Sequence, residues 1–420
     1  MNNEITEIIK KISEIIKFDS SQSAPESGAP FGKGVAEALN YFLNLAQSFG
    51  FETKNYEGYA GEVIFGEGEE FAILAHLDVV PAGSGWAHDP FGGEIDYKNQ
   101  KIWGRGAMDD KGPAVISLYA LKALKESGFK PNRKIKLIVG CNEESGWECI
   151  KYYKAHAHMP DEGISPDADF PVIFAEKGIM QIKITYPAEG DFSTLRGGDR
   201  PNMVCDYAEA EAPENAEKLQ KFGLSYENGK IISRGKSAHG STPQLGKNAI
   251  APLLLYLGLD GIYNSAFVRF FGFNDVNETA DDSGVITFSP NLIKGGKSFV
   301  EITFDVRYPV TFPAQKITEA IAAQSLKFEI LHEQAPLYND KQSFLIQTLL
   351  SVYNEVTGKN AEPVAIGGGT YARALKYGAA FGPEEAGEES TIHQANEYIT
   401  FEKIEKCYKI YTLALYRLTK

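Results

Sequence analysis

The chain alternates between strand-like and helix-like segments from about residue 35 to about residue 180. A helical pattern over GVAEALNYFLNLAQSFG precedes short apolar runs, GEVIFGEG and FAILAH, that are typical of strands. A second helical pattern, GPAVISLYALKALKESG, is followed by the strand-like KIKLIVGC and by a further helix that begins near Gly146. This alternation predicts an α/β layer with a largely parallel or mixed sheet.

The pattern changes after about residue 181. The run KSFVEITFDVRYPV alternates apolar and polar residues, which is typical of an antiparallel sheet with one buried and one solvated face. Helical stretches accompany it at APLLLYLGL and QKITEAIAAQ, and two more helical patterns follow after about residue 336. Because 420 residues exceed the roughly 250 to 300 at which one core stops growing, we predict two domains. Residues 1–180 and 336–420 form the first, and an α+β insertion at 181–335 forms the second.

The charge and the cysteine content indicate which classes of ligand and which cellular compartment suit the protein. The formal net charge of −14 opposes binding to nucleic acid or to anionic lipid, so a small molecule or peptide is the better ligand class. The first 17 residues carry charges through an apolar helical pattern, unlike a signal peptide, and no run is long enough to span a membrane. The four cysteines lack CxxC spacing, as in reduced cytosolic proteins. We therefore expect a cytoplasmic protein without nucleic-acid or membrane partners.

Acidic residues and histidines gather where predicted strands end. They fall into four clusters, His76 with Asp78, Asp109 with Asp110, Glu143 with Glu144, and Asp167 with Asp169. Ligands of open α/β sheets bind at the carboxyl ends of strands. We therefore expect these clusters to converge on one crevice.

Each cluster also has an ordinary structural explanation. Asp109 and Asp110 could cap a helix that has Pro113 in its first turn, and Glu143 and Glu144 suit the positive end of the next helix. The recurrence of one pattern at four places favours a site. Histidine and carboxylate together suit zinc, manganese or cobalt, and a carboxylate can bridge two such ions whereas an imidazole cannot.

Five motifs in order resemble a known family. They are AHLDVVP, GRGAMDDKG, NEESG, SPDADFP and STIHQANE. Together they are similar to those of the co-catalytic zinc exopeptidases and aminoacylases, which include succinyl-diaminopimelate desuccinylases, glutamate carboxypeptidase and carnosinases. The segments FGKGVAEALNYFLNLAQSFGF, SPDADFPVIFAEKG and GGGTYAR resemble the dipeptidase V subfamily of Xaa-His-type dipeptidases. The resemblance implies a mixed-sheet α/β catalytic domain interrupted by an α+β lid domain.

The resemblance also implies a metal site with two divalent ions, zinc first and manganese or cobalt as alternatives. His76, Asp109 and Asp167 would hold one ion. Asp109, Glu144 and His393 would hold the other, so that Asp109 bridges the two.

The same resemblance assigns the catalytic groups. Glu143 would be the general base that takes a proton from a metal-activated water and passes it to the leaving nitrogen. Asp78 would orient His76, as metal-bound imidazoles require. His239, in the loop RGKSAHGSTPQLGKNAI of the insertion, would stabilise the oxyanion of the tetrahedral intermediate.

Substrate contacts are implied for four further residues. Asn202 in GGDRPNMV and Arg307 in FDVRYP match positions that hold a terminal carboxylate, although Arg307 could instead form a surface ion pair. Gly368 and Gly369 belong to GGGTYAR, which lacks the Lys-Ser/Thr of a P-loop and matches a substrate-facing glycine loop.

The leading hypothesis is a metal-dependent dipeptidase that acts on short peptides with a free carboxylate. An N-acyl-amino-acid or succinyl-diaminopimelate amidohydrolase, with a small acylated substrate, is the alternative within the same chemistry. A binding protein that has lost catalysis is disfavoured because all five ligand positions, Glu143 and His239 are present. The resemblance favours a monomer, and the short insertion leaves a homodimer open.

Overall fold

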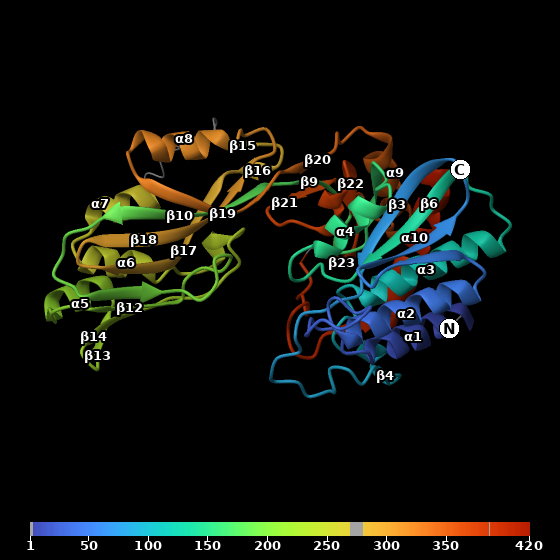
Figure 1. Ribbon diagram of the computed structural model, residues 1–420, viewed down its shortest axis with the longest axis horizontal. Coiled ribbons are helices and arrows are strands. Elements are labelled where there is room, and N and C mark those ends of the chain that lie inside the picture. The colour runs from blue at the N-terminus through green and yellow to red at the C-terminus, as the bar shows by residue number, and fades with distance from the viewer. Residues whose placement is uncertain (1–2, 269–279, 386) are drawn as a thin grey trace. The chain divides into compact units, whose positions relative to one another are not determined.

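The protein is described here from a computed structural model, which covers residues 3–268, 280–385 and 387–420 (Figure 1). The chain divides into two compact units. Unit 1 comprises Met1–Phe174, Tyr338–Val364 and Thr370–Lys420, and unit 2 comprises Ala175–Leu337 and Ala365–Gly369.

The helices of unit 1 follow the apolar periodicity of the sequence. In α1, for example, Ile5, Ile8, Ile12 and Ile16 recur at helical spacing and all are buried, which confirms the predicted amphipathic helix. The helices of unit 1 are α1 Asn3–Ile16, α2 Lys33–Ser48, α3 Lys111–Glu126, α4 Glu148–His156, α9 Phe344–Thr357 and α10 Phe401–Thr419, with a short helix η3 at Tyr371–Ala374.

A mixed sheet forms the centre of unit 1. Its strands in spatial order are β1 Glu52–Tyr56, β2 Ala60–Phe65, β6 Arg133–Gly140, β3 Glu69–His76, β7 Glu162–Ser165, β22 Tyr377–Ala380 and β9 Ile173–Glu176. The predicted α/β layer with a mixed sheet is therefore confirmed. Strands β20 Leu337–Tyr338 and β21 Val364–Ile366 lie at the unit boundaries.

Four neighbouring strands of this sheet run in the same direction. Strand β3 is parallel to β6 on one side and to β7 on the other, and β7 is parallel to β22. The last six residues of β3 and of β6 are buried, as expected for strands covered on both faces. Helix α3 packs against both strands, while α2 and α4 pack against β1 and β2. The carboxyl ends of β3, β6 and β7 therefore meet at one edge.

Smaller sheets complete unit 1. One consists of β24, β5 and β4 in that order, and another pairs β8 with β23. Their bounds are β4 Glu94–Asp96, β5 Lys101–Trp103, β8 Ala168–Phe170, β23 Pro383–Glu385 and β24 Tyr398–Thr400.

Unit 2 is built on an antiparallel sheet. In spatial order its strands are β13 Ser225–Glu227, β14 Lys230–Arg234, β12 Tyr207–Glu211, β11 Thr194–Gly197, β17 Thr287–Gly296, β18 Phe299–Tyr308, β10 Gly178–Pro187 and β19 Lys327–Gln334. Its remaining elements are α5 Ala216–Phe222, η1 Pro243–Leu245, α6 Ile250–Tyr256, α7 Asp260–Tyr263, η2 Asn264–Val268, β15 Ala280–Asp281, β16 Gly284–Val285 and α8 Gln315–Ala323. The predicted α+β character of this region is confirmed.

Strand β18 follows its predicted alternation only in part. Val300, Ile302 and Phe304 are buried in the hydrophobic core of unit 2, as the pattern predicts. The polar face was expected to be solvated, but Asp305 and Arg307 are also buried. The two side chains form an ion pair, so each buried charge has a partner.

Within the described residues, no helix combines the length and apolarity that a bilayer crossing requires. All four cysteines are free thiols in buried positions.

Candidate functional site

The site of unit 1 lies at the edge where the parallel strands end. His76 is the last residue of β3, Glu143 and Glu144 follow the end of β6, and Asp167 follows the end of β7. Three of the four predicted clusters thus follow three parallel strands and lie at one edge of the sheet. The fourth, Asp109 with Asp110, directly precedes α3.

Asp109 stands at the centre of this group. Its Oδ1 lies 2.9 Å from Nε2 of His76, and its Oδ2 lies 2.9 Å from Nε2 of His393. One carboxylate therefore offers a different oxygen to each of two histidines. This is the arrangement that a bridging ligand needs.

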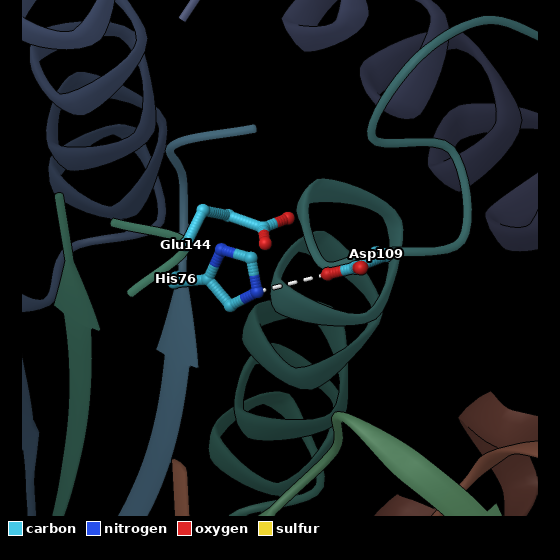
Figure 2. A group of neighbouring side chains, drawn as sticks. All are labelled: His76, Asp109 and Glu144. Atoms are coloured by element: carbon cyan, nitrogen blue, oxygen red, sulfur yellow. Dashed lines mark ion pairs between the residues drawn. The ribbon is translucent and has the colours of Figure 1, made fainter. Parts of the chain in front are cut away.

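Two further carboxylates flank the histidines. Oδ2 of Asp167 lies 3.7 Å from Nε2 of His76, and Oε1 of Glu144 lies 3.1 Å from Nε2 of His393. Figure 2 shows the Glu144 carboxylate next to the His76 ring, with Asp109 across from it. One ligand atom from each of these three residues lies within 4.8 Å of the others. The structure thus brings together all five residues that the sequence analysis named as metal ligands.

The donor set fits a divalent cation. Nε2 of His76 and Oδ1 of Asp109 are buried and form an ion pair at 2.9 Å, but neither atom makes a hydrogen bond within the described chain. Buried polar atoms that lack a hydrogen bond are rare in folded proteins. Imidazole nitrogen and carboxylate oxygens are the ligands preferred by zinc and similar ions.

The electrostatics of the cluster also favour a cation. Burial and the charge of Asp109 raise the pKa of Asp167 to about 7. Burial opposes the charged form of His393, but its hydrogen bonds to Asp109 and Glu144 outweigh this and raise its pKa to about 11. Burial likewise acts to raise the pKa of Asp109, yet the two histidines hold it well below its usual range. Asp167, buried beside the Asp109 charge, therefore keeps its proton for part of the time at neutral pH unless positive charge is supplied.

Asp78 and Asp110 hold the backbone around the cluster. The two oxygens of Asp78 accept hydrogen bonds from the backbone N–H groups of Glu143 and Glu144, at 3.0 and 3.1 Å. The Nδ1 atom of His76 lies closer to the backbone oxygen of Asp78, at 2.9 Å, than to its carboxylate, at 3.6 Å. Asp110 was considered a helix cap, but its side chain makes no capping bond and instead accepts from the N–H of His76.

Glu143 has a partner that the sequence analysis missed. The indole Nε1–H of Trp147 donates to its Oε1 at 3.1 Å, and the indole ring packs edge-on against Tyr371. Burial, with the nearby Asp167 and Glu144 charges and against the opposing effect of His76, raises the pKa of Glu143 well above its usual range. In the sequence, the only sign of this contact is that Trp147 lies four residues after Glu143.

His239 lies in unit 2, in the loop before η1. The backbone N–H of Ser241 donates to its Nδ1 at 3.2 Å, and the Ser241 hydroxyl lies 2.7 Å from the same atom. Burial, with the nearby Arg307 charge, lowers the pKa of His239. A neutral ring whose Nδ1 accepts must carry its proton on Nε2. His239 is thus arranged to donate from Nε2.

Arg307 and Asn202 also belong to unit 2. The surface ion pair considered for Arg307 is not found, because the side chain is buried, with Nε and Nη2 bound to Asp305. Its Nη1 donates to the backbone oxygen of Gly367 at 2.8 Å. The backbone oxygen of Asn202 accepts from the N–H of Gly240, beside His239. Gly368 and Gly369 follow Gly367 in the short return segment of unit 2.

The chain is similar to known proteins along almost all of its length. It matches the family described as "Peptidase family M20/M25/M40" over residues 72–417. "Putative dipeptidase YtjP" of Bacillus subtilis (strain 168) is 36% identical, and the match covers 100% of each chain. "Beta-Ala-Xaa dipeptidase" of Lactobacillus delbrueckii subsp. lactis is 34% identical, over 98% of this chain and 96% of the relative.

Solved structures share the fold at low identity. The aminoacylhistidine dipeptidase of Vibrio alginolyticus gives a TM-score of 0.61 at 13% identity, covering 98% of this chain and 96% of the other. The M20 family metallo-carboxypeptidase Sso-CP2 of Sulfolobus solfataricus gives 0.60 at 18% identity, covering 100% of both. The chain therefore belongs to peptidase family M20/M25/M40 and is a metallopeptidase that uses a divalent metal ion.

Proposed function

We propose that this protein is a dipeptidase that hydrolyses the amide bond of short peptides with a free C-terminal carboxylate. Two relatives that match along their whole length carry dipeptidase names, at 36% and 34% identity. The single observation that carries the two-metal part of the proposal is Asp109, whose two oxygens each lie 2.9 Å from a different histidine.

The proposed metal ligands divide into two sets that share Asp109. His76, Asp109 and Asp167 hold one ion, and Asp109, Glu144 and His393 hold the other. When bound, two zinc ions would provide a water of lowered pKa and would polarise the scissile carbonyl. Manganese or cobalt could replace zinc, because histidine and carboxylate ligands also suit them.

Glu143 is proposed as the general base. Its Oε1 is held by Trp147, so Oε2 is the oxygen left to accept the proton of the attacking water. The raised pKa of this buried carboxyl gives it the proton affinity that a base near neutral pH requires. The same proton can then pass to the leaving nitrogen.

The residues of unit 2 are proposed to bind the substrate. His239 donates from Nε2 to the oxyanion of the tetrahedral intermediate. Arg307 and Asn202 hold the terminal carboxylate, with the guanidinium oriented by Asp305. Gly368 and Gly369 allow the peptide backbone to approach closely.

The proposal is tested with protein stripped of metal and then refilled with zinc, manganese or cobalt. The substrates are Ala-Ala, Leu-Leu, β-Ala-His, N-acetyl-Met and N-succinyl-diaminopimelate. We expect cleavage of the dipeptides with a free amino group, restored only by added metal. Cleavage confined to the two acylated compounds would instead make the protein an N-acyl-amino-acid or succinyl-diaminopimelate amidohydrolase.

A further inference from the structure

Glu397 is a buried carboxylate that none of the proposed catalytic steps uses. Its side chain is 0% exposed and pairs with Arg105, whose Nη1 donates to its Oε2 at 2.7 Å. The two residues are 292 positions apart in the chain. Glu397 lies four residues after His393, a proposed metal ligand.

The second oxygen of Glu397 binds the backbone of another ligand-bearing segment. Oε1 accepts hydrogen bonds from the N–H groups of Gly106, Met108 and Asp109, at 3.1, 2.9 and 3.3 Å. The backbone oxygen of Glu397 accepts a fourth, from Gly104, at 2.9 Å. These residues lie between β5 and α3, where neither sheet nor helix supplies their partners. One carboxylate oxygen of Glu397 therefore holds three backbone N–H groups of the segment that presents Asp109.

Glu397 is itself fixed from both sides. The next residue, Tyr398, begins β24 and pairs with Trp103 at the end of β5. On the other side, the Asn396 side chain accepts from the N–H of Ala87 at 2.7 Å. Both flanking contacts are made with residues that are not proposed metal ligands.

We propose that Glu397 is a positioning residue that couples the two segments that present Asp109 and His393 to the metal ions. The inference rests on the proposed ligand roles of those two residues. Loss of a group that orients a metal ligand typically weakens metal binding by 10- to 100-fold. Glu397 would act in this way on the ligand that the two ions share.

The test must separate positioning from simple stability. Replacing Glu397 alone leaves the buried charge of Arg105 without its carboxylate partner, and such a loss strongly destabilises folded proteins. The double variant Glu397→Leu with Arg105→Met removes both charges, and such replacements are often neutral for stability. The N–H groups of residues 106, 108 and 109 still lose their acceptor.

The dissociation constant for zinc is measured by competition with a chromophoric chelator, beside the melting temperature. We expect zinc binding to the double variant to be 10- to 100-fold weaker, with a melting temperature within a few degrees of the wild type. Should the double variant melt early, Glu397→Gln keeps a neutral acceptor oxygen, and we expect about tenfold weaker binding in its folded form. Wild-type zinc affinity in either folded variant would overturn the positioning role.

Two control variants complete the test. Glu385→Gln alters another buried carboxylate of unit 1, which binds Lys359, Lys406 and Tyr353, and should leave zinc affinity unchanged. Asp109→Asn removes the proposed shared ligand and should weaken zinc binding more than the double variant does. If Asp109→Asn binds zinc like the wild type, the proposed metal site itself fails, and the positioning role fails with it.

Discussion

The indole N–H of Trp147 donates a hydrogen bond to Oε1 of Glu143 at 3.1 Å. Trp147 precedes α4 in a left-handed backbone conformation, with φ of 64°, which turns its side chain back towards the start of the same loop. The proposed general base is therefore held by a residue only four positions away.

Trp147→Phe should lower kcat by about 10- to 100-fold, because a hydrogen bond to a charged group contributes about 1.5–3 kcal/mol. Phenylalanine retains the packing against Tyr371 and lacks the N–H group. Steady-state kinetics on a cleaved dipeptide measures the effect. In a Glu143→Gln background the substitution should have no further effect, and an equal loss there would exclude action through Glu143.

Glu143→Gln should reduce hydrolysis by about 10²- to 10⁴-fold, since it removes the proposed proton acceptor. Metal analysis of the purified variant should still find both ions, because Glu143 is not among the proposed ligands. Loss of metal from this variant would mean that Glu143 and Glu144 have exchanged roles.

His239→Ala should lower kcat by about 10²- to 10³-fold through loss of one oxyanion donor. Metal content should remain at the wild-type level, since His239 belongs to unit 2 and the proposed ligands to unit 1. The matched control is His156→Ala at an exposed position, which should leave kcat unchanged. Parallel loss of metal and activity in His239→Ala would show that its assigned role is wrong.

Metal binding should release protons near neutral pH. In the metal-free protein the pKa of His393 is raised to about 11, so its imidazole is protonated at pH 7 and must lose that proton to bind a metal ion. The pKa of Asp167, about 7, adds a fractional proton. Apparent zinc affinity should therefore rise with pH up to about 11, and more steeply below about 7, where Asp167 is protonated as well.

Calorimetric zinc titrations in buffers of different ionisation enthalpy measure this release directly. We expect at least one proton per chain at pH 7, and binding heats that do not depend on the buffer would contradict the account. The free energy of unfolding of the metal-free protein should fall as pH rises, whereas zinc affinity rises. Because the pKa of His393 is higher in the folded protein than in the unfolded chain, its protonation stabilises the fold. This contribution is complete below the unfolded pKa of about 6.5 and is lost as pH rises through about 11.

The strands that carry the metal cluster were predictable because buried strands have recognisably apolar sequences. Strands β3 and β6 are buried along most of their length, so they appear in the sequence as continuous apolar runs. The polar residue that follows such a run marks the sheet edge. Strand β22, with the sequence YGAA, carries no comparable pattern and is identified by its pairing with β7 and β9.

The supporting contacts were not predictable for a different reason. Glu397 and Arg105 are buried charges whose partners lie 292 positions apart, and no periodicity connects them. Asp305 and Arg307 occupy polar positions of an alternating strand, so the pattern indicated a solvated face. The ion pair between them is local, since they are two positions apart, but the contact of Arg307 with Gly367 joins residues 60 positions apart and cannot be inferred from the strand pattern.

The central claim is that Asp109 is shared by two metal ions. Anomalous diffraction from zinc-soaked crystals, recorded on both sides of the zinc absorption edge, tests it most directly. The account predicts two anomalous peaks, one beside Oδ1 of Asp109 near His76 and one beside Oδ2 near His393. A single peak in a fully active enzyme, or two peaks without Asp109 between them, would contradict it.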